Sequence, residues 1–263
     1  MKTSIILCLV AMQGMEAMAN PPAINNFVWN IIQGPKHGQA FPGMPGATDP
    51  SIPNPGQSNA CFVCSDHYAA GERTSGVFQI SIFDGTQQRQ VSAYCDMSTA
   101  PGYTEYWLGL DNIHWLTIFC DQSTLRIDLA NCDDIEGSSD YNLFIVGDED
   151  SQYTVVAKFP SGTAGDGLNG AFATGITNGM SFSTFDVDND NRQVPTSNGP
   201  VSCSEIYSNA GWWFNNCAAA CLTGPYSSTC EANIRGLRWP SWPAATNVAN
   251  IFNRVAMKLR PGV

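Results

Sequence analysis

The nine cysteines that follow residue 60 constrain this chain more than any other feature of its sequence. They are Cys61, Cys64, Cys95, Cys120, Cys132, Cys203, Cys217, Cys221 and Cys230, and a tenth, Cys8, lies near the N-terminus. Cysteines at this density indicate a disulfide-bonded fold made in an oxidising compartment. Because nine is odd, we expect one cysteine to remain as a free thiol or to link a partner chain.

The first residues have the pattern of a secretory signal peptide. Lys2 precedes a short apolar segment, and Ala17-Met18-Ala19 supplies the small residues of a cleavage site. We therefore predict a signal peptide over residues 1–19 and a secreted, extracellular chain that begins near Asn20. No later segment approaches the roughly 20 apolar residues of a membrane helix, so no membrane span is expected.

Composition separates a leader from the folded domain, and the net charge argues against nucleic acid as a partner. The formal net charge is −11, and no basic run is present that could neutralise a line of phosphates, so nucleic acid is not an expected partner. Residues 20–60 are rich in Pro, Gly, Asn and Ser and predict a flexible leader. The folded domain is expected over residues 61–263.

Alternating apolar residues predict antiparallel strands from residue 77 onward. Val77–Phe83, the turn Asp84-Gly85 and Gln90–Tyr94 predict a β-hairpin. Residues 105–119 predict a short strand that leads into a helical turn. Further strands are expected at Leu125–Leu129, Asn142–Val146, Tyr153–Phe159 and Val255–Leu259. After Gly179 the regular pattern fades, and long irregular segments usually serve function or are fixed by metal and disulfides.

Short sequences along the chain occur in the order found in one family of extracellular domains. They are Thr74–Ile80, Tyr94–Met97, Tyr106–His114, Leu125–Leu129, Gly162–Asp166, Phe185–Asp190, Gly211–Trp213 and Met257–Pro261. Residues 64–263 therefore resemble the fibrinogen C-terminal-like domain of ficolins, tachylectins, angiopoietins and tenascins. The resemblance implies an α+β domain with a central antiparallel β-sheet and a loop-rich calcium and ligand subdomain. The family has a much longer segment where Pro101-Gly102-Tyr103 stands here.

The acidic run Asp186-Val187-Asp188-Asn189-Asp190 is the sharpest candidate site. Alternating acids can turn several carboxylates toward one Ca²⁺ ion, with backbone carbonyls completing its oxygen ligands. An EF-hand is excluded because Asn191 and Ser197 stand where that loop needs Gly and Glu. A solvated acidic turn is the alternative. The resemblance implies that the calcium ligands are Asp188 and Asp190, with backbone carbonyls of Arg192 and Val194.

The same resemblance implies two disulfides and a ligand site. It pairs Cys64 with Cys95 and Cys203 with Cys217. In lectin-like members a pocket beside the calcium loop accepts acetyl groups, and the matching residues are Tyr207 and the Asn216-Cys217 bond, which is cis in the family. Two further positions depart from the family pattern, because Ala218 replaces a His and Asn233 lies where a second Tyr is expected.

The remaining cysteines are paired by their place along the chain. Cys120 and Cys132 flank one predicted strand, and Cys221 and Cys230 span a short loop, so we predict these two disulfides. Cys61 is then left over, either as a free thiol or as a link to a partner chain. Zinc or redox chemistry at Cys61-x-x-Cys64 is disfavoured because no second ligand pair lies nearby.

These features predict a secreted, calcium-dependent recognition protein with lectin-like binding of glycans or acetylated groups, acting in innate defence. The alternative is an extracellular matrix or receptor-binding module that binds a cell-surface or matrix protein without sugar. A third reading is an assembled layer linked through Cys61. No enzyme activity is expected, because the sequence lacks the nucleophile elbow, phosphate loop and zinc-protease motifs. Trp212, Trp213, Trp239 and Trp242 could stack on sugars, but we expect them in the core.

Overall fold

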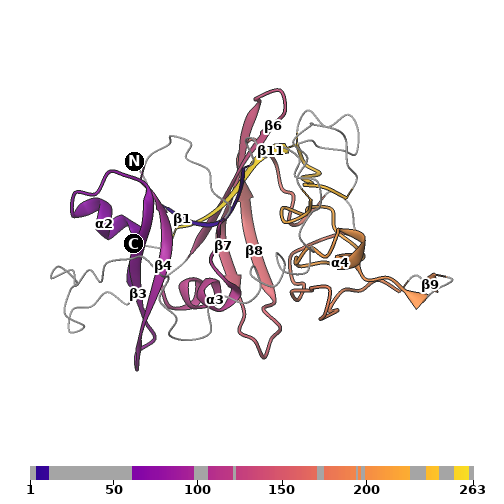
Figure 1. Cartoon of the computed structure of the whole chain (residues 1–263), viewed down its shortest axis with the longest axis horizontal. Coiled ribbons are helices and arrows are strands. Elements are labelled where there is room, and N and C mark those ends of the chain that lie inside the picture. The colour runs from indigo at the N-terminus through magenta and orange to yellow at the C-terminus, as the bar shows by residue number, and fades with distance from the viewer. Residues whose placement is uncertain are drawn as a thin grey trace, which may run out of the picture.

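The computed structural model describes residues 4–11, 61–97, 106–120, 123–170, 175–193, 195–196, 199–225, 235–242 and 252–260. Its centre is a nine-stranded antiparallel sheet with the order β2-β3-β4-β1-β11-β6-β7-β8, and β5 pairs with β1 (Figure 1). These strands are β1 (Ser4–Ala11), β2 (Cys61–Phe62), β3 (Gly76–Phe83), β4 (Gln88–Asp96), β5 (Tyr106–Trp107), β6 (Thr124–Asn131), β7 (Glu136–Val146), β8 (Val155–Ser161) and β11 (Phe252–Arg260).

Three helices and a small second sheet complete the described elements. They are α2 (Cys64–Ala69), α3 (Leu110–Phe119), α4 (Cys203–Ile206) and the pair β9 (Pro195–Thr196) and β10 (Gly199–Pro200). Figure 1 shows the largely irregular chain that follows β8, with α4 in it, gathered beside β8 and away from the β3–β4 hairpin. The fold class is therefore α+β, as the sequence predicted, with the loop region at one side of the sheet.

The predicted hairpin is confirmed as β3 and β4, which pair in register from Gly76↔Cys95 to Phe83↔Gln88. Its turn is stabilised by Asp84, whose Oδ1 accepts hydrogen bonds from the backbone N–H groups of Thr86 and Gln87 at 2.7 and 2.8 Å. These bonds favour the ionised carboxylate and lower the pKa of Asp84 to about 2.

Strand β7 is longer than the sequence predicted. Its first half is polar, because Ser138, Ser139 and Asp140 lie opposite β6 in the register. Arg126 of β6 forms ion pairs with Asp140 at 3.3 Å and with Asp128 at 2.8 Å. The alternation of apolar residues is lost in this part of the strand, and main-chain pairing with cross-strand charges stabilises it.

Helix α3 extends the predicted helical turn to ten residues. Gly109 precedes it with a φ of 90°, a conformation that glycine adopts without strain. Ile113 and Leu116 are buried one turn apart, so the helix packs one face on the sheet. Nδ1 of His114 donates a hydrogen bond to the carbonyl oxygen of Val146 at 2.8 Å, which ties the helix to the end of β7.

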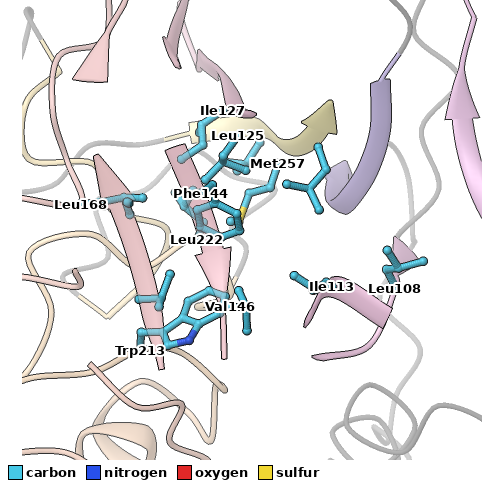
Figure 2. Packing of buried hydrophobic residues seen from close by; sticks show 14 of the residues in the cluster. Leu108, Ile113, Leu125, Ile127, Phe144, Val146, Leu168, Trp213, Leu222 and Met257 are labelled. Carbon is cyan, nitrogen blue, oxygen red and sulfur yellow. The ribbon is translucent and has the colours of Figure 1, made fainter. Parts of the chain in front are cut away.

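The core lies between the sheet and the elements that cover it. Leu125, Ile127 and Leu129 of β6 alternate into it and are at most 2% exposed. Figure 2 shows Ile127, Leu125 and Met257 close to Phe144, with Trp213 approaching the same region from the loop side. One continuous core therefore joins the sheet to the loop region that carries the candidate site.

The segment that the sequence predicts as the apolar part of a signal peptide forms β1 in this structure, between β4 and β11. The predicted cleavage site and residues 20–60 lie outside the described residues, so the signal peptide and the leader stay predictions. Within the described part of the chain, no helix is long and apolar enough to cross a membrane.

Candidate functional site

Buried tryptophans fix the loop region against the sheet. Trp212 exchanges two backbone hydrogen bonds with Ser183, at 2.9 and 3.1 Å. The indole N–H of Trp213 donates to the carbonyl of Tyr153 at 2.7 Å, and that of Trp239 donates to the carbonyl of Ala164 at 3.0 Å. Trp212, Trp213, Trp239 and Trp242 are 0, 2, 0 and 6% exposed. The predicted core role of these rings is confirmed.

The acidic run lies in a loop directly after Ser183. Asp188 is exposed, and its Oδ1 accepts the N–H of Asp190 at 3.2 Å. Asp190 is half-buried, and its two carboxylate oxygens accept the N–H groups of Arg192 at 2.7 Å and Cys203 at 2.6 Å. Burial raises the pKa of Asp190, and the nearby negative charge of Asp188 raises it further, while these backbone bonds oppose the rise. Two carboxylates are thus held close together.

This donor set fits Ca²⁺. Two adjacent carboxylates that repel each other gain from a cation placed between them, and calcium prefers oxygen ligands. No group of three or more His, Cys, Asp and Glu side chains that could hold a metal occurs in the part of the chain that the structure describes. Calcium would therefore take its remaining ligands from backbone carbonyls and water.

Of the two residues predicted to offer carbonyl ligands, Arg192 is described by the structure and Val194 is not. Arg192 follows directly in the same loop, and its Nε donates to the carbonyl of Val201 at 2.9 Å. Its backbone N–H is bound to Asp190, so residue 192 is close to the two acids. Val194 lies outside the described residues. The carbonyl ligands stay predictions.

The predicted ligand residues divide into exposed and buried groups. The Asn216-Cys217 peptide bond is cis, as the resemblance implied, and Asn216 is exposed. Tyr207 is 4% exposed and Ala218 is 8% exposed, and the hydroxyl of Tyr207 donates to the carbonyl of Ala218 at 3.4 Å. Asn233 lies outside the described residues. Tyr207 therefore belongs to the packed interior of this loop region.

The loop that carries the acidic run and the segment that presents Asn216 are joined directly. Asn191 donates its backbone N–H to the carbonyl of Asn215 at 2.9 Å and its side-chain amide to Oδ1 of Asn215 at 3.0 Å. Asp190 binds the N–H of Cys203, which is disulfide-bonded to Cys217. Both sides of the exposed Asn216 are thus connected to the acidic run. Sequence reasoning missed Asn191 and Asn215, although Asn215 stands directly before the Asn216-Cys217 bond that it singled out.

Arg238 is a second residue that sequence reasoning missed. Its Nη1 donates to the hydroxyl of Tyr207 at 2.8 Å, and its backbone exchanges two hydrogen bonds with Cys221. The contact brings together segments 31 residues apart. Burial raises the pKa of Tyr207, and the positive charge of Arg238 opposes that rise.

The structure contains the predicted disulfides Cys64–Cys95 and Cys203–Cys217, but it pairs Cys120 with Cys61. The predicted Cys120–Cys132 bond is wrong because an eight-residue extended strand, about 26 Å long, lies between the two. Cys132 is also disulfide-bonded. Cys61 therefore has no thiol left for the link to a second chain that the sequence suggested.

The predicted Cys221–Cys230 disulfide is also wrong. Cys221 is a free cysteine, and it is fully buried beside Thr223 and the backbone of Arg238. Burial raises its pKa to about 11, so the thiol is neutral at physiological pH.

A large antiparallel sheet with a long irregular region at its side defines the class of fold, and comparison with known proteins identifies the family. Residues 101–262 match the family described as the C-terminal globular domain of fibrinogen beta and gamma chains. The chain therefore belongs to the fibrinogen C-terminal domain family.

Individual members of this family are similar to the chain over most of its length. Fibrinogen-like protein 1 of Mus musculus is 33% identical, with 75% of this chain and 71% of that protein covered. Fibroleukin of Homo sapiens is 30% identical, with 75% of this chain and 51% of fibroleukin covered. The alignment with fibrinogen-like protein 1 has 236 positions, but it covers only 75% of the 263 residues of this chain. The aligned part of this chain is therefore shorter than the alignment, and some residues of the relative have no counterpart here. This agrees with the short connection between Met97 and Tyr106.

Solved structures show the same fold. The fibrinogen-like globe domain of human ANGPTL2 superposes with a TM-score of 0.62 at 22% identity, covering 76% of this chain and 98% of that domain. A lamprey fibrin D-dimer, solved in complex with the peptide ligand Gly-His-Arg-Pro-amide, has a TM-score of 0.62 at 24% identity, covering 75% of this chain and 72% of that one.

Proposed function

We propose that this protein is an extracellular, calcium-dependent recognition protein with lectin-like binding of glycans or acetylated groups, serving innate defence. The observation that carries the proposal is the double connection between the acidic run and the exposed Asn216: the Asn191–Asn215 hydrogen bonds on one side and the Asp190–Cys203–Cys217 path on the other. A cation bound at the acids would fix the position of the segment that presents Asn216.

Calcium would be held by Asp188 and Asp190 and would order the loops without taking part in a chemical step. Asp188 is exposed and makes its one side-chain hydrogen bond to a neighbour in the same loop, so its second oxygen can bind a cation. Asp190 already orients the N–H groups of Arg192 and Cys203. The protein is accordingly proposed to bind its partner and to catalyse no reaction.

The extracellular location is supported by the disulfides. Cys61–Cys120, Cys64–Cys95 and Cys203–Cys217 cross-link the described residues, and such bonds persist in oxidising compartments. The acidic net charge of −11 disfavours nucleic acid as a partner.

Retention on resins that carry acetylated and non-acetylated sugars, in calcium and in chelator, tests this proposal. We expect calcium-dependent retention that Asp188→Asn abolishes and that Asn216→Ala weakens. Asp186→Asn is the matched control, because Asp186 is exposed two residues away and its Oδ1 accepts from the hydroxyl of Thr184 at 2.6 Å. Equal retention in chelator would contradict the calcium dependence, and no retention on any sugar would contradict the lectin function.

A second candidate function is binding of a cell-surface or matrix protein without sugar. Two observations favour it. Tyr207 is buried and bonded to Arg238, and two apolar side chains at the acidic run are exposed, Phe185 directly before it at 39% and Val187 within it at 50%. Exposed apolar groups next to fixed charges are typical of protein-binding surfaces. A Phe185→Ser, Val187→Ser variant separates the two functions, because it should abolish protein binding and leave sugar retention unchanged.

A further inference from the structure

Arg238 brings a positive charge to the candidate site, and part of its guanidinium has no partner. The side chain is half-buried, and its Nη1 donates to the hydroxyl of Tyr207 at 2.8 Å. Its Nε and Nη2 make no hydrogen bond or ion pair with any residue that the structure describes. Neither nitrogen is sealed from solvent, because among the described residues Nε of Arg260 is the one buried side-chain polar atom without a partner. Two donor groups of Arg238 are therefore free to bind a ligand.

The charge of Arg238 is also unbalanced, although the chain has 23 acidic and only 12 basic residues. Charges that leave solvent are usually paired, as Lys258 is with Asp96 and Asp128 at 2.9 and 3.1 Å. Burial raises the pKa of Tyr207, and the ionisable groups that modify this rise are Arg238 and Cys221. No carboxylate of the described chain is among these groups, and the Cys221 thiol is neutral at physiological pH.

Hydrogen bonds hold this guanidinium beside residues 216–218, which we call the ligand segment. The backbone of Arg238 exchanges two hydrogen bonds with Cys221, at 2.8 and 3.1 Å. The hydroxyl of Tyr207, which accepts the bond from Nη1, donates in turn to the carbonyl of Ala218 at 3.4 Å. Ala218 directly follows the cis Asn216-Cys217 bond. Because the side chain is already oriented, a ligand that binds it loses little free energy in ordering it.

The two free nitrogens suit a carboxylate. Nε and Nη2 share one edge of the planar guanidinium, and an edge of this kind can bind both oxygens of a carboxylate group. A calcium ion at Asp188 and Asp190 would add positive charge on the other side of the ligand segment, since Asp190 binds the N–H of Cys203, which is disulfide-bonded to Cys217. Both charges favour a ligand with a negative group.

We propose that Arg238 forms an anion subsite beside the ligand segment and that this subsite selects acidic glycans, whose carboxylate it binds through Nε and Nη2. Tyr207 is a positioning residue, because it holds Nη1 and leaves the opposite edge of the guanidinium free. The choice of an acidic sugar rests on the proposed lectin function, whereas the anion subsite itself does not.

Two sugars that differ by one charge test the selection. N-acetylmuramic acid carries a carboxylate, and its methyl ester has the same ring and acetyl group without the charge. In calorimetric titration of the full chain in calcium, we expect the acid to bind about tenfold or more tightly than the ester, the effect of one or two charge-assisted hydrogen bonds. Equal affinity for the acid and the ester would overturn the proposal and leave the lectin function standing.

Substitution of Arg238 tests whether this residue is the cause. Arg238→Gln removes the charge but keeps an amide that can donate to Tyr207, so we expect the acid and the ester to bind this variant equally. Arg126→Gln, on strand β6, is the matched control and should keep the preference for the acid, because Arg126 is paired with Asp128 and Asp140. A preference that survives in Arg238→Gln would overturn the proposal.

Formate separates the anion subsite from the lectin function, because it has a carboxylate and neither a sugar nor an acetyl group. Formate is titrated into the unmodified ¹⁵N-labelled protein, and the Nε–H signal of Arg238, assigned with Arg238→Lys, is followed by nuclear magnetic resonance. We expect a saturable shift that neutral formamide does not produce. This shift without binding of any sugar would contradict the lectin function and support the subsite. A formate response no larger than that of formamide would overturn the subsite.

Discussion

Replacing Trp213 with phenylalanine measures how strongly the core supports the candidate site. The indole ring is 2% exposed and packs edge-on against Phe182 at 5.1 Å and Phe144 at 6.4 Å. Its N–H donates to the carbonyl of Tyr153 at 2.7 Å. Phenylalanine keeps a ring in the core but removes this donor and leaves a cavity.

The expected loss follows from these two effects. An unpaired carbonyl costs about 1–3 kcal/mol. The smaller ring adds part of the roughly 3–5 kcal/mol that complete truncation of a buried tryptophan costs. We therefore expect Trp213→Phe to lower the free energy of unfolding by about 2–4 kcal/mol.

Denaturant unfolding followed by circular dichroism measures this change. Phe159→Ala is the control, because Phe159 is 66% exposed and its truncation should change stability by no more than about 0.5 kcal/mol. Unchanged stability in Trp213→Phe, combined with lost ligand binding, would show that the ring contacts a ligand and would refute the core role.

Three further predictions concern the cysteines and the central ion pair. Folding raises the pKa of Cys221 from 9.0 to about 11, so the stability that the neutral thiol contributes is complete below pH 9 and is lost as the pH rises to about 11. Cys221→Ala should reduce this loss of stability by about 2–3 kcal/mol, as measured by denaturant unfolding at each pH. Native Cys221 should also resist iodoacetamide at pH 8 and react once the chain is unfolded. Cys61→Ser and Cys120→Ser should each cost about 2–5 kcal/mol, and the double variant no more than either, whereas additive losses would contradict their pairing. Lys258→Met removes the ammonium group that contacts both Asp96 and Asp128 and should cost about 1–3 kcal/mol at neutral pH, with unchanged stability as the contrary result.

Most strands could be predicted because their alternation of apolar residues has a direct physical cause. Leu125, Ile127 and Leu129 face the core because consecutive strand residues point to opposite faces. The polar first half of β7 could not be found in this way, since main-chain pairing and the Arg126–Asp140 ion pair stabilise it. Such stabilisation comes from contacts with the partner strand β6 and leaves no alternation of apolar residues in β7 to recognise.

Strand β1 shows a different limit of sequence reasoning. A short apolar segment after a lysine has the composition of a signal peptide and also that of a buried strand. The local sequence alone therefore cannot distinguish a signal peptide from a buried strand. The structure places the segment between β4 and β11, strands far apart in the chain, and no local pattern indicates that position.

The candidate site was predicted in its parts but not in its connections. The acidic run and the Asn216-Cys217 bond are local patterns with recognisable chemistry. The Asn191–Asn215 and Arg238–Tyr207 contacts join segments 24 and 31 residues apart, and the paths of the intervening loops follow from tertiary packing. The predicted Cys120–Cys132 disulfide is wrong for a related reason, because two cysteines at opposite ends of an extended strand are far apart in space.

Titration calorimetry of Ca²⁺ into the folded protein tests the central claim most directly. We predict saturable binding that Asp188→Asn abolishes and the neighbouring Asp186→Asn leaves intact, because we propose that Asp188 and Asp190 hold the cation. Absence of saturable binding by the unmodified protein, or equal loss in both variants, would contradict calcium-dependent recognition.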